Sequence, residues 1–186
     1  MEEERAFDGL PDGRIDAIYL HWTGDDEQRA FDSYHFCVVR QHGRLRVVRT
    51  HDLRENMRDI REDPSAPYAA HTFGRNSYAA GLAIAGMRGA NPHDFGPYPL
   101  RDDAVDALCR TIAKLAARYA IPIEPDRVMT HAEAALADGY FGLDPIEQRW
   151  DLARLQPDPR PLDTHEARVT GDILRHRARL LLRHDR

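Results

Sequence analysis

Apolar residues recur along this chain in short runs of the length expected for buried β-strands. These runs occupy residues 15–22, 34–40, 45–48, 79–85 and 127–129. The second and third runs are separated only by the segment 41–44, which contains Gly43 and predicts a β-hairpin. Strands joined by a hairpin are antiparallel, so we expect a sheet that is not wholly parallel.

A different spacing, with apolar residues three and four positions apart, predicts an amphipathic helix over residues 101–119. Asp102 and Asp103 suit its N-terminal end, where negative side chains interact favourably with the helix dipole. Residues 164–183 carry aliphatic side chains among several arginines and predict a final helix that is partly exposed.

Two stretches predict loops. Residues 50–72 are polar, contain two prolines and predict a long surface excursion of the kind that often carries binding function. The chain that follows His131 runs through Gly139, Gly142 and Pro145 before it reaches Asp151, and this composition also predicts a loop.

The length of 186 residues suits one well-packed domain. Strands interrupted by one strong helix predict an α/β fold, a single mixed central β-sheet flanked by helices. We expect residues 1–14 to form a lead-in, residues 15–156 the domain, and residues 157–186 a helical extension packed on that domain.

Composition excludes several classes of protein. The net charge of −5 argues against nucleic acid as a partner, and no apolar run approaches the roughly 20 residues of a membrane-spanning helix. The acidic N-terminus lacks the basic and apolar parts of a secretory signal, which predicts synthesis in the cytoplasm. Cys37 and Cys109 are too few for a disulfide framework, and we expect both to be buried as small apolar residues.

Two histidines stand where strand ends can bring them together. His21 lies near the end of the first apolar run, and His131 lies two residues after the strand candidate at 127–129. A carboxylate from Asp151 can supply a third protein ligand and leave a fourth position open for water. An open zinc site of this kind points to hydrolysis.

The motifs around these histidines, in their order along the chain, resemble a known enzyme family. They are His21-Trp22-Thr23, Tyr34-His35-Phe36, Ala70-His71-Thr72, the segment 76–86 and His131-Ala132-Glu133. Over residues 15–152 the chain resembles the type 2 zinc N-acetylmuramoyl-L-alanine amidases, which include phage lysozyme-amidases and peptidoglycan recognition proteins. The resemblance implies a zinc hydrolase that cleaves the bond between N-acetylmuramic acid and L-alanine in peptidoglycan.

This resemblance implies roles for particular residues. His21 and His131 take the positions of the two imidazole ligands of zinc. The third ligand is Asp151 or Asp144, and Asp151 is preferred because Arg149 lies two positions before it, where the phage enzymes have a catalytic lysine. Arg149 can then stabilise negative charge on the carbonyl oxygen, although its permanent charge makes it unsuitable as a proton donor.

Three further residues have implied roles outside the ligand set. Tyr34 matches the active-site tyrosine of the family, whose hydroxyl orients the attacking water. His71 is expected to bind substrate or assist proton transfer, and Glu133 to hydrogen-bond a ligand imidazole or to be a plain surface carboxylate. The family glutamate found near residues 81–86 in some members is replaced here by alanine.

We therefore expect a monomeric zinc amidase that acts on peptidoglycan or muropeptides. It acts either on the cell wall after release, as an endolysin does, or on muropeptides in the cytoplasm. The alternatives are a module of the same fold that binds peptidoglycan without cleaving it, and a zinc hydrolase of the same fold that cleaves another acylated peptide.

Overall fold

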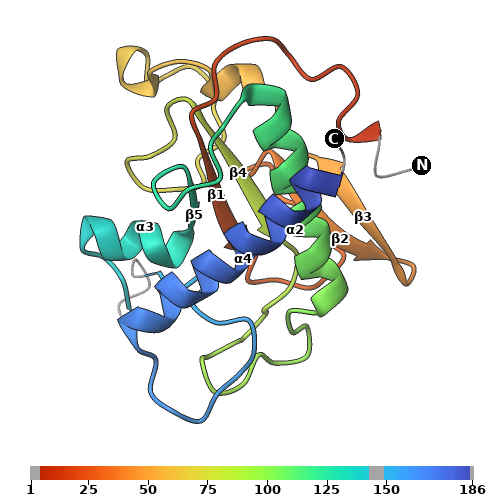
Figure 1. Cartoon of the computed structure of the whole chain (residues 1–186), viewed down its shortest axis with the longest axis vertical. Coiled ribbons are helices and arrows are strands. Elements are labelled where there is room, and N and C mark those ends of the chain that lie inside the picture. The colour runs from red at the N-terminus through yellow and green to blue at the C-terminus, as the bar shows by residue number, and fades with distance from the viewer. Residues whose placement is uncertain (1–4, 143–148, 185–186) are drawn as a thin grey trace.

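The computed structural model describes residues 5–142 and 149–184, and its central element is a five-stranded sheet (Figure 1). Its strand order is β3-β2-β4-β1-β5. The strands are β1 (Ala17–Trp22), β2 (Phe36–Gln41), β3 (Arg44–Arg49), β4 (Ala79–Ile84) and β5 (Val128–Thr130). Each predicted run therefore overlaps an observed strand, with bounds that differ by at most two residues.

The sheet is mixed, as predicted. Strand β1 lies between β4 and β5 and runs parallel to both, and β2 runs parallel to β4. Among the paired strands of this sheet in the described residues, only the β2–β3 hairpin is antiparallel. Because β1, β4 and β5 share one direction, their carboxyl ends meet at one edge of the sheet, which is where ligands bind in open α/β sheets.

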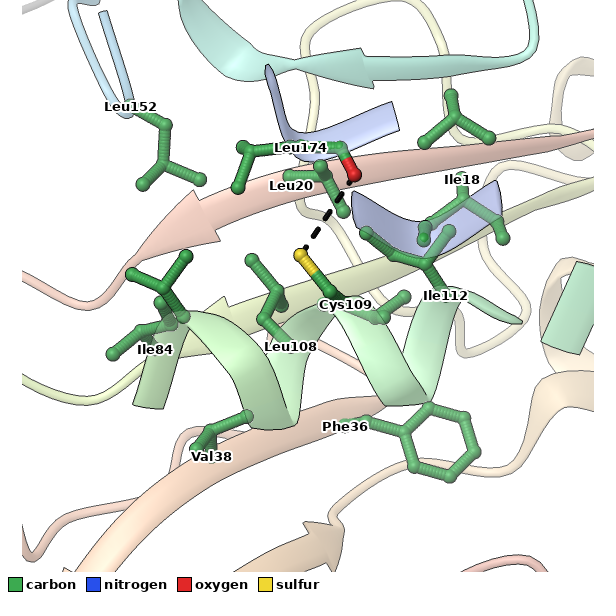
Figure 2. Packing of buried hydrophobic residues seen from close by; sticks show 14 of the residues in the cluster. Ile18, Leu20, Phe36, Val38, Ile84, Leu108, Cys109, Ile112, Leu152 and Leu174 are labelled. Atoms are coloured by element: carbon green, nitrogen blue, oxygen red, sulfur yellow. Dashed lines mark hydrogen bonds between the residues drawn. The ribbon is translucent and has the colours of Figure 1, made fainter. Parts of the chain in front are cut away.

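Two long helices cover one face of this sheet. Helices α2 (Asp102–Tyr119) and α4 (Thr164–His184) lie on the same side of it (Figure 1). Ile18 and Leu20 of β1 pack there against Leu108, Ile112 and Leu174 (Figure 2). Both predicted helices and the α/β fold class are thus confirmed. Cys109 is buried in this core and its thiol donates to the carbonyl oxygen of Leu174, while Cys37 is buried on the other face.

The prediction of a loop after His131 is wrong for the first part of that segment, because residues His131–Asp138 form helix α3. Thr130 caps this helix in a capping box with Glu133, and four alanines with high helix propensity follow within it. Gly139 ends the helix in the left-handed conformation, with φ of 80°. The glycine that suggested a loop is the C-terminal cap of a short helix.

The long excursion at 50–72 is anchored to the sheet. It contains two short 3₁₀ helices, η1 (Leu53–Asn56) and η2 (Ile60–Glu62), whose Leu53 and Ile60 are buried. The buried Asn56 side chain donates to the carbonyl oxygens of Ala69 and Asn76 and accepts from the amide of Ala69. These bonds hold Ala69 and Asn76, on either side of the end of the excursion, against η1.

Side chains of β1 and β4 alternate between two faces. The core face carries Ile18, Leu20, Leu82 and Ile84 toward α2 and α4. The opposite face, which we call the histidine face, carries Tyr19, His21, Gly81 and Ala83. Within the described residues, no helix is both long and apolar enough to cross a membrane.

Candidate active site

The register of the sheet brings the two predicted histidine ligands together. Leu20 of β1 pairs with Thr130, the last residue of β5. The residues that follow them, His21 and His131, therefore lie at the same edge of the sheet. His21 is the fifth residue of β1 and is fully buried, and His131 is the first residue of α3 and is 6% exposed. Two residues 110 positions apart in sequence thus meet because their strands are parallel neighbours.

Asp151 completes a group of three ligand atoms. The Nδ1 atoms of His21 and His131 lie 3.0 Å apart, and Oδ2 of Asp151 lies 3.6 Å from the first and 3.3 Å from the second. Two atoms that bind one zinc ion tetrahedrally at about 2.0–2.1 Å are separated by about 3.4 Å. The three residues therefore fit a tetrahedral zinc ion whose fourth position remains available.

The chemistry of the three atoms also suits a cation. Burial lowers the pKa of His21 to about 4, although the hydrogen bond with Asp151 opposes this effect. Burial alone would raise the pKa of Asp151, but hydrogen bonds with His131 and His21 outweigh it and lower that pKa. At neutral pH the site thus presents a neutral imidazole and a carboxylate, the forms that bind metals.

The main chain fixes Asp151 in this place, since its carbonyl oxygen accepts a hydrogen bond of 3.1 Å from the amide of Ala132. The bond ties the segment of the third ligand to the first turn of α3. Asp144, the alternative third ligand, lies outside the described residues.

Behind His21 lies a residue to which the sequence argument gave no role. The Oγ1 atom of Thr72 is 3.2 Å from Nε2 of His21 and 2.9 Å from Nδ1 of His71. A hydroxyl that joins two imidazoles fixes the orientation of the first ring and leaves its Nδ1 directed at Asp151. The only sequence signal for Thr72 is its place next to His71.

His71 lies beneath this hydroxyl rather than on an exposed loop. It is 5% exposed, and its ring packs on the backbone of Gly81, where a Cβ atom would come within 2.4 Å of it. Burial holds the pKa of His71 well below its usual value. The structure thus favours a role in orienting His21, and the predicted role in substrate binding stays a prediction.

Tyr34 and Arg149 border the ligand group. The ring centroid of Tyr34 lies 5.0 Å from that of His21. Burial, and then the charge of Asp151, raise the pKa of the Tyr34 phenol, which therefore keeps its proton at neutral pH and can donate a hydrogen bond. The charge of Arg149 makes a smaller contribution: it adds to the lowering of the pKa of His21 by burial and partly offsets the raised pKa of Tyr34.

Glu133 does not bond a ligand imidazole, and it is not a surface carboxylate either. It is 7% exposed, and its carboxylate accepts from the amide of Thr130 at 2.9 Å and from the buried guanidinium of Arg175 at 2.8 and 2.9 Å. The expected hydrogen bond from Glu133 to a ligand imidazole is therefore wrong, because both carboxylate oxygens bond Arg175 of α4.

Comparison with known proteins decides the family. The model of the N-acetylmuramoyl-L-alanine amidase family matches residues 11–150, which is most of the chain. The chain belongs to this family. Among solved structures, the amidase is similar to the Ph2119 endolysin from Thermus scotoductus MAT2119 bacteriophage Ph2119, with 18% identity and a TM-score of 0.42 over 67% of this chain and 75% of that one. A search of the curated proteins gave no match.

Membership identifies the reaction. An N-acetylmuramoyl-L-alanine amidase hydrolyses the amide bond that joins N-acetylmuramic acid to the first residue of the peptide in peptidoglycan. The match spans His21, Tyr34, His71 and His131 and ends one residue before Asp151.

Proposed function

We propose that this amidase is zinc-dependent and that His21, His131 and Asp151 hold the ion. The observation that carries the proposal is the spacing of their ligand atoms, all within 4.8 Å of one another in a buried group of two imidazoles and one carboxylate. Three protein ligands leave the open coordination position that distinguishes a catalytic zinc from a structural one.

Zinc bound there would supply Lewis-acid chemistry, which polarises an amide carbonyl and makes water acidic near neutral pH. The chain supplies the rest. Tyr34, whose phenol stays protonated, can donate a hydrogen bond to the attacking water or to the carbonyl oxygen. Arg149 contributes a permanent positive charge that opposes the negative charge developing on that oxygen.

The substrate is peptidoglycan or a soluble muropeptide, and the bond is the one between N-acetylmuramic acid and L-alanine. Lysis of the wall after release and recycling of muropeptides both remain predictions, as does the monomeric state. The non-catalytic module is the less favoured alternative, because each of the three ligand positions holds a residue that can bind zinc.

Metal content and bond specificity test the proposal together. Purified protein should contain about one zinc ion per chain, and His21→Ala and His131→Ala should each lose it. The zinc-loaded protein should release new L-alanine amino termini from purified peptidoglycan and no new reducing sugar ends. Reducing ends would contradict the bond assignment, and sedimentation with the wall without either product would favour the binding module.

The choice of third ligand has its own matched pair of variants. Asp151→Ala should weaken zinc binding far more than Asp144→Ala, because the Asp151 carboxylate lies within 3.3 Å of His131 Nδ1. The opposite ranking would assign the ligand to Asp144 and would remove the argument for Arg149.

A further inference from the structure

The C-terminal helix α4 lies beyond the residues matched by the family, yet it contacts the segments that carry two of the proposed ligands. It follows Asp151 in the chain and packs against α3 and β5 as well as α2. In Figure 1 its N-terminal half passes beside α3. Its apolar side chains join the core, and its contact with α3 includes a buried ion pair.

Arg175 makes the principal contact. This arginine is only 1% exposed, and its guanidinium forms two parallel bonds with the carboxylate of Glu133 at 2.8 and 2.9 Å. The same group donates to the carbonyl oxygen of Val128 in β5 and to Asp172 in α4, both at 2.8 Å. Buried bidentate pairs of this kind have a fixed geometry, so they define position as well as charge.

Glu133 connects the Arg175 contact to the helix turn that carries His131. It is the third residue of α3, and its carboxylate accepts from the amide of Thr130 while its own amide donates to the Thr130 hydroxyl. The first turn of α3, which begins with His131, is thus held by its capping box on one side and by Arg175 on the other. The imidazole of His131 must be placed accurately because two other ligand atoms lie within 3.3 Å of it.

A glycine in α4 makes room for the contact. A Cβ atom on Gly171 would lie 2.1 Å from Oε2 of Glu133 and 2.3 Å from Oε1. Glycine inside a helix is less stable than alanine, so its presence here is explained by the close approach of the carboxylate.

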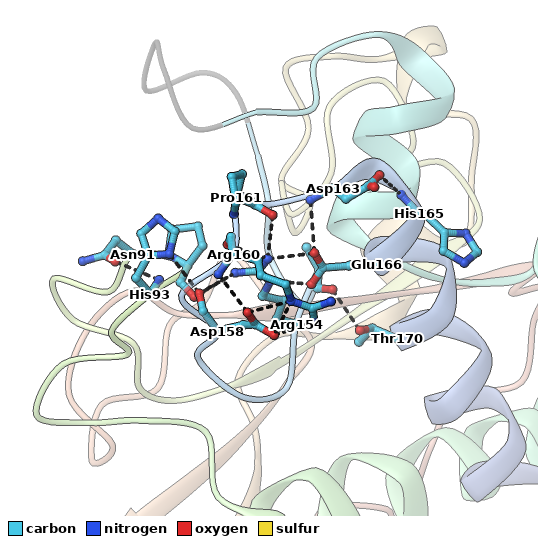
Figure 3. Close-up of polar contacts among 12 residues, drawn as sticks. Asn91, His93, Arg154, Asp158, Arg160, Pro161, Asp163, His165, Glu166 and Thr170 are labelled. Carbon is cyan, nitrogen blue, oxygen red and sulfur yellow. Dashed lines mark hydrogen bonds and ion pairs between the residues drawn. The ribbon is translucent and has the colours of Figure 1, made fainter.

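The same helix also holds the segment of Asp151. The hydroxyl of Thr170 donates to the carbonyl oxygen of Ala153 at 2.9 Å. The neighbouring Arg154, 4% exposed, pairs with Glu166 in the first turn of α4 and donates to the carbonyl oxygens of Asp158 and Pro161 (Figure 3). Both ligand-bearing segments on this side of the site are therefore attached to α4.

We propose that α4 is part of the metal site and that Arg175 acts through Glu133 as a positioning residue for His131. The proposal rests on the zinc-dependent function above. It predicts that disturbing the Arg175–Glu133 contact weakens zinc binding even where the protein remains folded.

Two variants test this. Gly171→Ala removes no hydrogen-bonding group and favours the helix, but it displaces the Glu133 carboxylate. The double variant Glu133→Gln/Arg175→Met removes both charges together and so avoids leaving one buried charge unpaired, which would be strongly destabilising. His176→Ala and Arg177→Met, exposed or half-buried positions on the same helix, are the matched controls.

Zinc affinity is measured by competition with a chelator, and the free energy of unfolding of the zinc-free protein by denaturant. Both test variants should bind zinc about tenfold or more weakly, the usual effect of losing a group that orients a ligand, while the controls bind as wild type does. Gly171→Ala decides the question if the double variant does not fold.

Wild-type affinity in folded Gly171→Ala would overturn the inference, as would a change confined to the free energy of unfolding, which would show that the contact is merely structural. A wild-type protein that binds no zinc would instead contradict the proposed function, so the two failures are distinguishable.

Discussion

The two faces of strand β1 have opposite properties although their residues alternate along one strand. Ile18 and Leu20 enter an apolar core with α2 and α4, where each finds ordinary packing partners. Tyr19 and His21 point the other way, and His21 enters a buried group of polar side chains. A shift of one residue in register would place Tyr19 and His21 in the core and Ile18 and Leu20 on the opposite face. The packing of the core therefore also fixes the position of the His21 imidazole.

The six residues of β1 thus contribute to stability on one face and to the candidate site on the other. The core face gains free energy from burial of apolar surface. On the opposite side of the sheet, burial disfavours the charged forms of His21, His35 and His71 and so lowers their pKa values, which costs stability as the pH falls below the usual range of histidine. Such a polar group persists in a folded protein where function requires it.

The largest expected effect comes from an alanine substitution on each face of β1. His21→Ala should abolish zinc binding and amide hydrolysis while the chain remains folded. Leu20→Ala, its neighbour on the core face, should cost about 2–5 kcal/mol of unfolding free energy, yet the folded fraction should still bind zinc. Zinc content per folded chain and denaturant unfolding measure both. Full zinc binding by His21→Ala would break the comparison.

The next effect concerns residues that border the ligands without binding zinc. Tyr34→Phe and Arg149→Ala should keep the metal, but turnover should fall on the order of a hundredfold or more because a group that stabilises the transition state is lost. Rates of L-alanine amino-terminus release are compared at equal zinc occupancy. Loss of zinc in either variant would place that residue in the ligand environment instead.

A smaller effect is expected behind His21. Thr72→Val removes the hydroxyl that joins His21 to His71, and zinc affinity should fall by about tenfold, whereas Thr72→Ser should retain most of it. The pair separates loss of the hydroxyl from loss of the methyl group. Equal affinities for the valine and serine variants would show that the hydroxyl does not orient His21.

A last effect, small near neutral pH, is a pH dependence of stability. Burial, followed by the nearby charge of His51, lowers the pKa of His35 to about 3, and Nδ1 of His35 accepts from the amide of Gly81 at 3.0 Å. The unfolded chain therefore binds a proton that the folded chain does not between about pH 6.5 and 3, so stability falls as the pH is lowered through this window.

His35→Gln keeps an acceptor for Gly81 and removes the titration, so the slope of unfolding free energy against pH should decrease by up to about 1.4 kcal/mol per pH unit. Denaturant unfolding of the zinc-free protein at several pH values measures it. An unchanged slope would mean that His35 takes up its proton in the folded state as easily as in the unfolded one.

Much of the fold was predictable from the sequence because the strands and long helices have clear periodicity. The apolar runs at 15–22 and 127–129 predicted the strands Ala17–Trp22 and Val128–Thr130, and the histidines near the ends of these runs indicate the edge of the sheet where they meet. The Asp102–Tyr119 helix was equally clear from its apolar spacing. Local pattern is sufficient where an element has its own run or spacing of apolar residues.

The short helix and the attachments of the site were less predictable. The capping box of Thr130 and Glu133 lies within a segment whose glycines suggest a loop. The roles of Thr72, Gly171 and Arg175 depend on contacts between residues distant in sequence, such as the 42 positions between Glu133 and Arg175. No local pattern encodes such a contact, because it arises only when α4 packs against α3.

Removal and return of zinc test the central claim most directly. Purified protein is treated with a chelator, its metal content is measured, and release of L-alanine amino termini from peptidoglycan is followed before treatment, after it, and after zinc is added back. The account predicts about one zinc ion per chain at the start, loss of hydrolysis with loss of the metal, and recovery on addition of zinc in wild type but not in His131→Ala. Full hydrolysis by protein freed of zinc would contradict it.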